Sequence, residues 1–496
     1  MPAEKDFIYN GYDYDRNFVR LKREEVVGFL SLKFFIFLPI VLVLYYTAGK
    51  RGRTDLSKTV LVVSSMAFFF MYGIPSFLIL LASCVFNLIW SRVLEKNKKP
   101  VLLAAGIIVN VLPLLSFKYL NFFGENIAHI TGGEFTALDI IQPVAISYYT
   151  FQMITWTVDS YRGETEGTRL PDYLAYVWFF PRVIMGPITR HDEFIPQMKE
   201  KKTFLPDPEN IATGFVWFTV GMSKKLLLAS RYGAASVYGF MQGSELSLLE
   251  GWLCSVAYTF EIYLDFSGYC DMAAGVAKMF GINIPMNFNS PYKAVSISDF
   301  WKRWHISLTS FLRKYIYFPL GGNRKGKVRT YFNMLAIFVI SGFWHGANWT
   351  FILWGTLHGV VMIAERLIGK KLDKIPKFIR IPVTFALVNI GWVLFSSADL
   401  AQAGVFLKEM FSPDNIMPAV AFYDSFDLGT VPFIRYHLNI AIPLFYVITY
   451  ACLLLTRNIY EKKYKPDLKT ALITGILFTW SFLHANSVAG FIYFNF

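Results

Sequence analysis

Long apolar runs recur along the whole of this 496-residue chain, and they constrain its fold more than any other feature. Many of these runs are roughly 17–20 residues long, which is the length that a helix needs to cross a bilayer core about 30 Å thick. Charged residues make up only 17% of the chain, whereas a soluble globular protein carries about 25%. The sequence therefore predicts an all-α polytopic membrane protein of ten to twelve transmembrane helices. The predicted spans are Leu30–Ala48, Pro75–Ile89, Val101–Phe117, Ile141–Val158, Ile211–Ala229, Trp252–Phe266, Ile381–Phe395, Leu438–Leu455 and Ala471–Phe491, and Tyr331–Leu367 is long enough for two more.

Lysine and arginine gather in short loops and give the chain a net charge of +13. Two intervening loops, Asn121–Asp139 and Tyr238–Glu250, contain neither residue. This alternation is the positive-inside pattern, which places the basic loops in the cytoplasm and the uncharged or acidic loops outside. The charge therefore predicts topology and contact with anionic membrane lipids, and it argues against nucleic acid as a partner.

The domain organisation is expected to be simple. Residues 1–28 form a polar N-terminal tail, and residues 29–496 are predicted to form a single membrane-embedded domain with a catalytic core at about 141–367. The four cysteines are scattered, without the spacing of metal ligands or of a disulfide framework. No metal site is therefore expected.

Two regions depart from the regular pattern of spans. Tyr173–Arg190 is apolar but contains prolines and arginine, which indicates a re-entrant or broken helix beside a cavity. Gly268–Thr330 mixes charged and aromatic residues, which is typical of short amphipathic helices at the cytoplasmic interface. Glu261, Asp265 and Asp271 form either a proton path or structural ion pairs with basic residues, and we favour ion pairs.

Histidine marks the candidate site. His345 lies in SGFWHGANW, at the predicted turn of the helical hairpin Tyr331–Leu367. A histidine at membrane depth costs free energy and seldom persists without a partner or a task, and a packing role between helices is the alternative. His305, in the amphipathic WKRWHISL, is by itself typical of an interfacial residue. For His358, on the second arm of the hairpin, packing and function are equally supported.

The basic turn Gly321–Val328 nearly matches a phosphate-binding loop. Val328 stands where that motif needs Ser or Thr, and no strand precedes it, so we do not expect nucleotide triphosphate binding. Arg324, Lys325 and Lys327 are instead predicted to attract a phosphorylated cofactor to the cytoplasmic face. Neither GxSxG nor HExxH is present, so serine-hydrolase and zinc-peptidase chemistry lack support.

These stretches together resemble the membrane-bound O-acyltransferase family, and within it the branch typified by the membrane subunit of bacterial alginate O-acetyltransferase. The matching segments are Pro143–Gly163, Phe179–Arg190, Tyr263–Asn287, Asp299–Gly322 and Ser341–Gly359, in family order. The resemblance implies a helical bundle around a central tunnel. It also implies that His345 is the invariant histidine of the family and His305 its second histidine.

The resemblance further implies that an acyl-CoA donor, expected to be acetyl-CoA, enters from the cytoplasm, with no cofactor bound permanently. A secreted or membrane-anchored SGNH-type partner would then carry the acyl group to an exported cell-envelope polysaccharide. We therefore predict an O-acetyltransferase of the bacterial cytoplasmic membrane. His345 is its general base, and His305 positions or polarises the thioester. Asn348, Trp344 and His358 are predicted to support the site.

Three other functions stay open. The first is D-alanyl transfer to teichoic acid from a carrier-protein thioester, by a branch that shares both histidines. The second is a transporter, since buried histidines also serve proton or solute movement, although the sequence contains none of the inverted repeats that are common in transporters. The third is a scaffold that only holds a partner enzyme.

Overall fold

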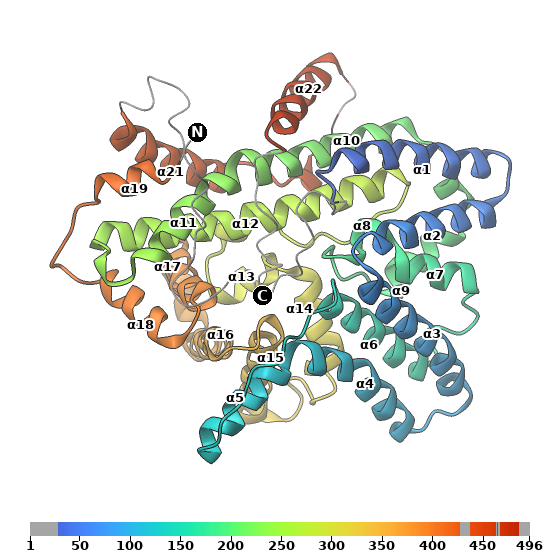
Figure 1. Cartoon of the computed structure of the whole chain (residues 1–496), viewed down its shortest axis with the longest axis horizontal. Coiled ribbons are helices and arrows are strands. Elements are labelled where there is room, and N and C mark those ends of the chain that lie inside the picture. Colours follow the sequence, from blue (N-terminus) through green and yellow to red (C-terminus); the bar gives the residue numbers. More distant parts are fainter. Residues whose placement is uncertain (1–27, 427–436, 463, 465–466, 486–496) are drawn as a thin grey trace. The chain divides into compact units, whose positions relative to one another are not determined.

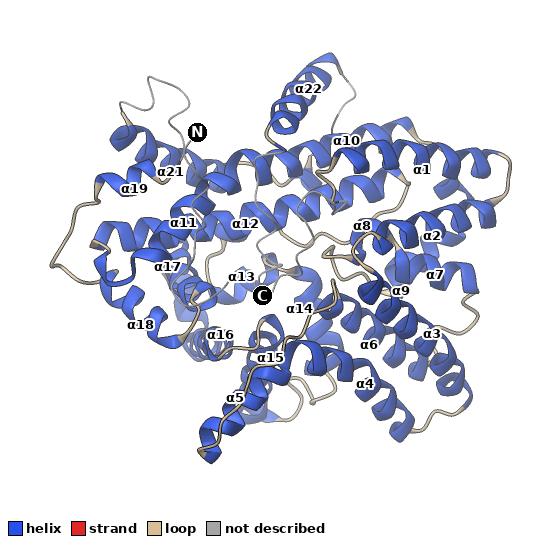
Figure 2. Cartoon of the chain, in the orientation of Figure 1, coloured by secondary structure: helices blue, strands red, loops and turns tan. Residues whose placement is uncertain are grey.

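The computed structural model describes residues 28–426, 437–462, 464 and 467–485 (Figure 1). Within these ranges the regular elements are all helical, without a strand (Figure 2), so the all-α prediction is confirmed. Residues 1–27 of the predicted tail lie outside the described residues. The chain divides into two compact units, and the single membrane-embedded domain expected for residues 29–496 remains a prediction.

Among the described residues, the first unit contains those up to Tyr45 together with Asp55–Ile184. The second contains Tyr46–Thr54 and the described residues from Met185 onward, so residues of the predicted core at about 141–367 belong to both units. Helices of the first unit are α1 (Leu32–Lys50, whose end belongs to the second unit), α2 (Thr54–Phe70), α3 (Ile74–Lys96), α4 (Pro100–Leu114), α5 (Leu120–Thr131), α6 (Ile146–Arg162), α7 (Leu170–Trp178) and α8 (Phe180–Val183).

Buried polar side chains join three helices of the first unit. Asn87 on α3 and Asn110 on α4 donate to each other's side-chain oxygens at 2.7 and 3.0 Å. Thr157 on α6 donates to Asn87 at 2.8 Å and accepts from Asn110 at 3.1 Å. Such hydrogen bonds hold helices together in lipid, where burial of apolar surface does not distinguish one helix neighbour from another.

The broken helix predicted in Tyr173–Arg190 is present. Helix α7 ends at Trp178, the four-residue α8 follows, and the chain is non-helical until α9 begins at His191. Pro181 in α8 and Pro187 in the non-helical stretch lack the backbone N–H that a continuous helix needs.

The second unit contains the remaining helices. They are α9 (His191–Lys199), α10 (Pro208–Ser223), the π-helix η3 (Lys224–Ala229), α11 (Ser230–Gln242), α12 (Leu248–Met279), α13 (Ile297–Arg303), α14 (Ile306–Leu312), α15 (Gly326–His345), α16 (Trp349–Ile368), α17 (Lys377–Ser396), α18 (Leu400–Glu409), α19 (Val420–Asp424), α21 (Leu438–Leu455) and α22 (Leu468–Leu483). Within the stretch Gly268–Thr330, residues up to Met279 belong to the long helix α12, and the short helices predicted there are present as α13 and α14. Their place at the cytoplasmic interface remains a prediction.

The centre of the second unit is the 32-residue helix α12, which packs against α10, α11 and α17. Gly214 and Gly221 on α10 lie against Gly275 and Gly268 on α12. A Cβ atom at any of these glycines would overlap the carbonyl of the glycine opposite. The two backbones are therefore in direct contact, as small residues allow in membrane helices.

Seven helices of the described residues are long and apolar enough to cross a membrane, so the chain is a multi-pass membrane protein. They are Leu32–Lys50, Ile74–Lys96, Pro100–Thr131, Pro208–Glu245, Trp349–Lys374, Lys377–Ser396 and Leu438–Glu461. The other predicted spans correspond to α6, α12, α15 and α22, which are shorter or more polar. The central tunnel remains a prediction.

Candidate active site

The helical hairpin α15–α16 carries the candidate site in the second unit. The two arms pack closely because Gly342 lies against the carbonyl of Phe351 and Gly355 lies against that of Phe338. The turn Gly346–Asn348 places His345 at the last position of α15, as predicted. Asn348 begins α16, where its side-chain oxygen accepts from the backbone N–H of Thr350 at 3.1 Å.

The side chain of Asn348 bonds within and beside the turn that follows His345. Its amide nitrogen donates to the carbonyl of Ala398 at 2.6 Å, so both the oxygen and the nitrogen of the amide form hydrogen bonds with backbone groups. The predicted supporting role of Asn348 is to cap α16 and hold the turn rather than to bond with the imidazole.

His345 is 4% exposed, and its hydrogen bond defines its tautomer. Nδ1 lies 2.6 Å from the carbonyl oxygen of Ser341, one helical turn earlier. A carbonyl oxygen only accepts, so Nδ1 carries the hydrogen in this bond. The neutral ring then keeps its lone pair on Nε2, which is the form that a general base requires.

Aromatic rings surround His345. The ring of Trp344 lies 4.8 Å away, that of Trp354 lies 5.0 Å away and that of Phe395 lies 5.4 Å away, measured between ring centres and all nearly perpendicular to the imidazole. The predicted support from Trp344 is thus a direct contact. Surroundings of this kind exclude water and strengthen electrostatic interactions inside the site.

His305 lies beside His345, with ring centres 6.4 Å apart and ring planes at 80°. It occupies the junction between α13 and α14 in the left-handed backbone region, at φ +44°. Its side chain is fully buried. A residue with a Cβ atom is strained by about 1–2 kcal/mol in this region, and such strain is found most often at functional sites.

The chemistry of His305 differs from part of our prediction. Burial and the neighbouring His345 hold the pKa of His305 well below its ordinary value, so the ring is neutral. Nδ1 lies 3.2 Å from Oδ1 of Asn287, and that oxygen also accepts from the backbone N–H of Ser307. Nδ1 therefore donates, and Nε2 is an acceptor. A neutral His305 in this tautomer has no hydrogen with which to polarise a thioester oxygen, and the positioning role is the one that fits.

His358 on α16 has a packing environment. Its Nδ1 accepts a hydrogen bond from Nε1 of Trp301 at 3.3 Å. Its ring centre lies 5.3 Å from Trp301 and 5.2 Å from Trp354. The neutral ring therefore carries its hydrogen on Nε2, the opposite tautomer to His345. His358 packs against Trp354, which also contacts His345, and its supporting role remains a prediction.

The basic residues Arg324, Lys325 and Lys327 are exposed and lie at or before the start of α15. His345 ends the same helix. At about 1.5 Å of rise per residue, Lys327 and His345 are roughly 27 Å apart. The basic loop and the two histidines therefore form separate regions of the second unit.

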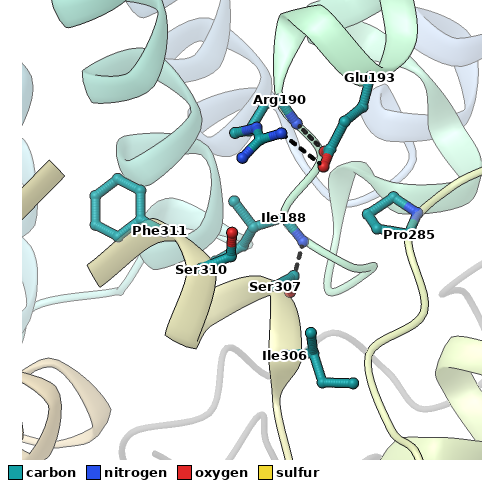
Figure 3. Close-up of a pocket in the computed structure, with 8 residues that line it drawn as sticks. All are labelled: Ile188, Arg190, Glu193, Pro285, Ile306, Ser307, Ser310 and Phe311. Atoms are coloured by element: carbon teal, nitrogen blue, oxygen red, sulfur yellow. Dashed lines mark hydrogen bonds and ion pairs between the residues drawn. The ribbon is translucent and has the colours of Figure 1, made fainter. Parts of the chain in front are cut away.

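A small pocket of about 80 Å³ lies next to the His305 segment (Figure 3). Ser307, two residues after His305, is one of its walls. The Ser307 hydroxyl accepts from the backbone N–H of Ile188 at 3.0 Å, the bond drawn in Figure 3, and donates to Asn287 at 2.8 Å. Its full lining is Ile188, Arg190, Glu193, Pro285, Ile306, Ser307, Ser310 and Phe311.

Two of the three acidic residues singled out on α12, Asp265 and Asp271, form ion pairs, as we favoured. Lys224 contacts Asp271 at 2.6 Å, and Lys225 contacts Asp265. Both lysines belong to the π-helix η3, and the Lys225–Asp265 pair is buried. These two carboxylates neutralise lysines between helices, whereas for Glu261 the choice between an ion pair and a proton path stays open.

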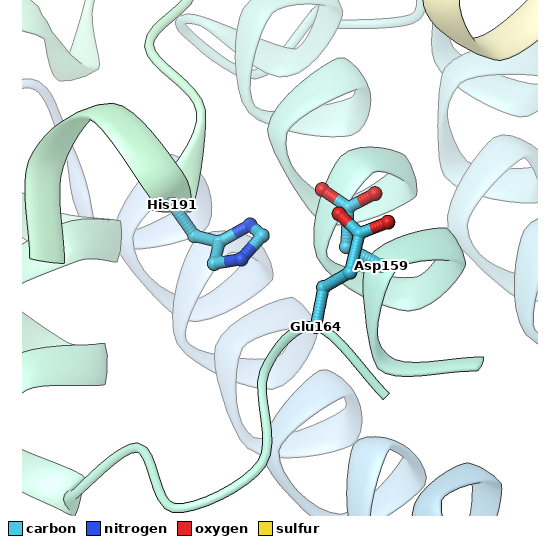
Figure 4. A group of neighbouring side chains, drawn as sticks. All are labelled: Asp159, Glu164 and His191. Atoms are coloured by element: carbon cyan, nitrogen blue, oxygen red, sulfur yellow. The ribbon is translucent and has the colours of Figure 1, made fainter. Parts of the chain in front are cut away.

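Acidic residues also gather where α6 ends in the first unit. Asp159 is buried and pairs with Arg162 at 3.5 Å. Glu164 follows the helix, and its backbone N–H donates to the Asp159 carbonyl at 2.9 Å. Figure 4 shows the two carboxylate side chains near one another. Gly163 between them has φ +81°, so this is a common helix ending. His191, also drawn there, belongs to the second unit.

Two polar residues of the site were missed by the sequence analysis. Asn287 and Ser307 hold His305, yet nothing in their local pattern distinguishes them from other buried polar residues. Asn287 ends one of the segments that carried the family resemblance, and Ser307 lies in another. That placement was the available signal.

The chain belongs to the membrane-bound O-acyltransferase family, whose model matches residues 25–400. It is therefore a membrane acyltransferase, which decides against the transporter and the scaffold.

Three relatives indicate where in the family the chain lies. It is 34% identical to the peptidoglycan O-acetyltransferase of Helicobacter pylori, over 93% of this chain and 96% of that protein. It is 36% identical to the probable alginate O-acetylase of Pseudomonas aeruginosa, over 76% of this chain and 73% of that protein. It is 25% identical to the teichoic acid D-alanyltransferase of Bacillus subtilis, over 74% of this chain and 97% of that protein.

Proposed function

We propose that this protein O-acetylates an exported polysaccharide of the bacterial cell envelope from within the cytoplasmic membrane. The donor is a cytoplasmic thioester, acetyl-CoA, and a secreted or membrane-anchored SGNH-type partner completes delivery outside. The names of the relatives support this proposal, since two of the three describe O-acetylation of a polysaccharide. Peptidoglycan is the first acceptor to test, because that relative matches 93% of this chain.

The observation that carries the proposal is the pair of buried histidines with Nε2 as acceptor. In the reaction the acceptor hydroxyl gives its proton to Nε2 of His345 while its oxygen attacks the thioester carbonyl. The tetrahedral intermediate collapses with cleavage of the carbon–sulfur bond. The leaving thiolate then takes the proton from the His345 imidazolium, and the ring returns to its starting form.

The surroundings support this chemistry. The carbonyl of Ser341 stabilises the imidazolium that forms on His345, because it accepts the Nδ1 hydrogen. The aromatic rings keep water from hydrolysing the thioester. His305 provides a second acceptor at Nε2, which holds the hydroxyl-bearing substrate in place.

The basic loop has a separate task in this proposal. Arg324, Lys325 and Lys327 attract the phosphates of the donor at the cytoplasmic face. Because Lys327 lies roughly 27 Å from His345 along α15, these basic residues bind the donor where it enters the protein, away from the histidines. The thioester end of the donor has to travel inward from there.

The test is acetyl transfer in proteoliposomes that contain the full chain. His345→Ala should lower the rate by about 10²–10⁴-fold, the usual contribution of a general base. His484→Ala is the matched control, because its Nδ1 bonds to the carbonyl of Trp480 at 2.9 Å in the same way but outside the core. Equal thermal stability and monodispersity should be shown for each preparation.

Two results would contradict the proposal. One is a folded His345→Ala protein that transfers acetyl at the normal rate. The other is transfer only from a D-alanyl carrier-protein thioester, which would favour the function named for the Bacillus subtilis relative.

A further inference from the structure

Asn287 lies at the centre of a buried hydrogen-bond group around His305. It is 1% exposed and follows α12 in a non-helical segment. Its side-chain oxygen accepts three hydrogen bonds: from Nδ1 of His305 at 3.2 Å, from the Ser307 backbone N–H at 3.2 Å and from the Ser307 hydroxyl at 2.8 Å. The Ser307 N–H can only donate, so this atom of the amide is the oxygen.

Backbone hydrogen bonds of the segment Asn287–Asn289 hold the strained turn at His305. The carbonyl of Asn287 accepts from the backbone N–H of Ile306 at 2.9 Å, and the N–H of Asn289 donates to the carbonyl of Arg303 at 2.8 Å. These two bonds flank His305 on either side in the chain. These two bonds hold the backbone of His305 in its left-handed conformation. Such a strained conformation persists only where several surrounding contacts fix it.

The amide of Asn287 can orient an imidazole without charging it. A carboxylate at the same place would stabilise the imidazolium, and the acceptor at Nε2 would be lost. The ionisable groups near His305 include His345 on α15 and, behind Asn287, Cys270 on α12, whose Sγ lies 3.4 Å from the amide nitrogen. The Lys224–Asp271 pair lies beyond Cys270 and acts on its thiol. Aromatic neighbours of the ring include Phe266 at 5.1 Å and Trp344 at 6.2 Å between ring centres.

We propose that Asn287 is the positioning residue of His305, which selects the tautomer with hydrogen on Nδ1 and so keeps Nε2 as an acceptor in the active site. Nε2 of His305 is buried and has no hydrogen-bond partner among the described residues. The inference rests on the proposed role of His305 in acyl transfer. It does not depend on which donor or acceptor is used.

The first measurement uses the unmodified full chain in detergent, with ¹⁵N-labelled histidine rings. Comparison with His305→Gln assigns the His305 signals. At pH 7 Nδ1 should be protonated and Nε2 unprotonated. This measurement needs no substrate, so its result does not depend on whether the proposed function is correct. A His305 found with its hydrogen on Nε2 would overturn the proposal.

The second measurement uses Asn287→Asp, which keeps the shape and the acceptor oxygen. Three donors aimed at this position favour the carboxylate form, which should raise the pKa of His305 by about 1–3 units. Activity should then be lost at a higher pH than in the unmodified protein. Asn389→Asp is the matched control, since Asn389 is equally buried but bonds only to Ser255 and Thr259.

The outcomes separate a positioning role from a structural one. The proposal expects the His305 titration to move in Asn287→Asp and to stay in place in Asn389→Asp. A folded Asn287→Asp protein with an unchanged titration would overturn it. If the variant does not fold, the tautomer of the unmodified protein decides the question.

Discussion

The imidazole rings of His305 and His345 lie 6.4 Å apart between centres, at an angle of 80°. Each ring donates from Nδ1 to a protein oxygen, on Asn287 and Ser341 respectively. In its neutral form, each ring held in this way is an acceptor at Nε2. The site therefore consists of two acceptors, and a proton taken up by one ring raises the cost of protonating the other.

The first prediction concerns stability at acid pH. The pKa of His305 is held well below 6.5 in the folded chain by burial and by His345. The unfolded chain binds a proton at this residue near pH 6.5, whereas the folded chain does not. The free energy of unfolding should therefore be at its plateau above about pH 6.5 and fall below it, by up to about 1.4 kcal/mol per pH unit.

Thermal unfolding in detergent between pH 7 and pH 5 measures this effect. His305→Gln should show a shallower fall than the unmodified chain, since it lacks the group that takes up the proton on unfolding. Parallel curves for the two proteins would contradict the assignment of His305 as a buried neutral ring.

The second prediction concerns the contact between α15 and α16. Gly342→Ala places a methyl group against the carbonyl of Phe351, so it should lower the free energy of unfolding by about 1–3 kcal/mol. It should also lower acetyl transfer, because His345 lies three residues further along. Gly404→Ala is the control: nothing lies within 4 Å of its added Cβ, and the change should be neutral or stabilising by up to about 1 kcal/mol. Equal effects of both substitutions would exclude a close helix contact at Gly342.

The third prediction concerns the basic loop. Replacing Arg324, Lys325 and Lys327 with glutamine should weaken acetyl-CoA binding, and more strongly at low salt, because salt screens exposed charges. The matched control replaces Lys370, Lys371 and Lys374, which are exposed after α16 at the same end of the hairpin. Binding measured by calorimetry at two salt concentrations should change little in the control. Identical affinities for both triple variants would remove the specific role of the first loop.

The fourth prediction concerns topology. In a chain without its native cysteines, single cysteines at Thr131 and Ser244 should react with an impermeant maleimide in intact cells. Cysteines at Arg53 and Asn323 should react only after permeabilisation, because the basic loops are cytoplasmic. All four positions are exposed in the structure, so burial does not protect them. External labelling at Asn323 would reverse the orientation and the donor side.

The sequence by itself determined the class of fold and the two histidines. Apolar length and charge alternation act locally, since a helix in lipid has to satisfy its own backbone wherever it lies. The break in Tyr173–Arg190 and the hairpin turn at His345 followed from proline and glycine for the same local reason. His305 became a candidate through the resemblance of its segment to a family, since its own surroundings predicted only an interfacial residue.

Only the tertiary structure decided how these residues work. The proximity of His305 to His345, the tautomer imposed by Asn287 and the ion pairs of η3 with α12 all join residues that are distant in the chain. Asn348 caps helix α16, and His358 accepts a hydrogen bond from Trp301. Which hydrogen bond each side chain makes depends on the groups that helix packing brings next to it. The same polar residue in the same local pattern has a different task when its neighbours differ, which is why the roles within the site could not be read from the sequence.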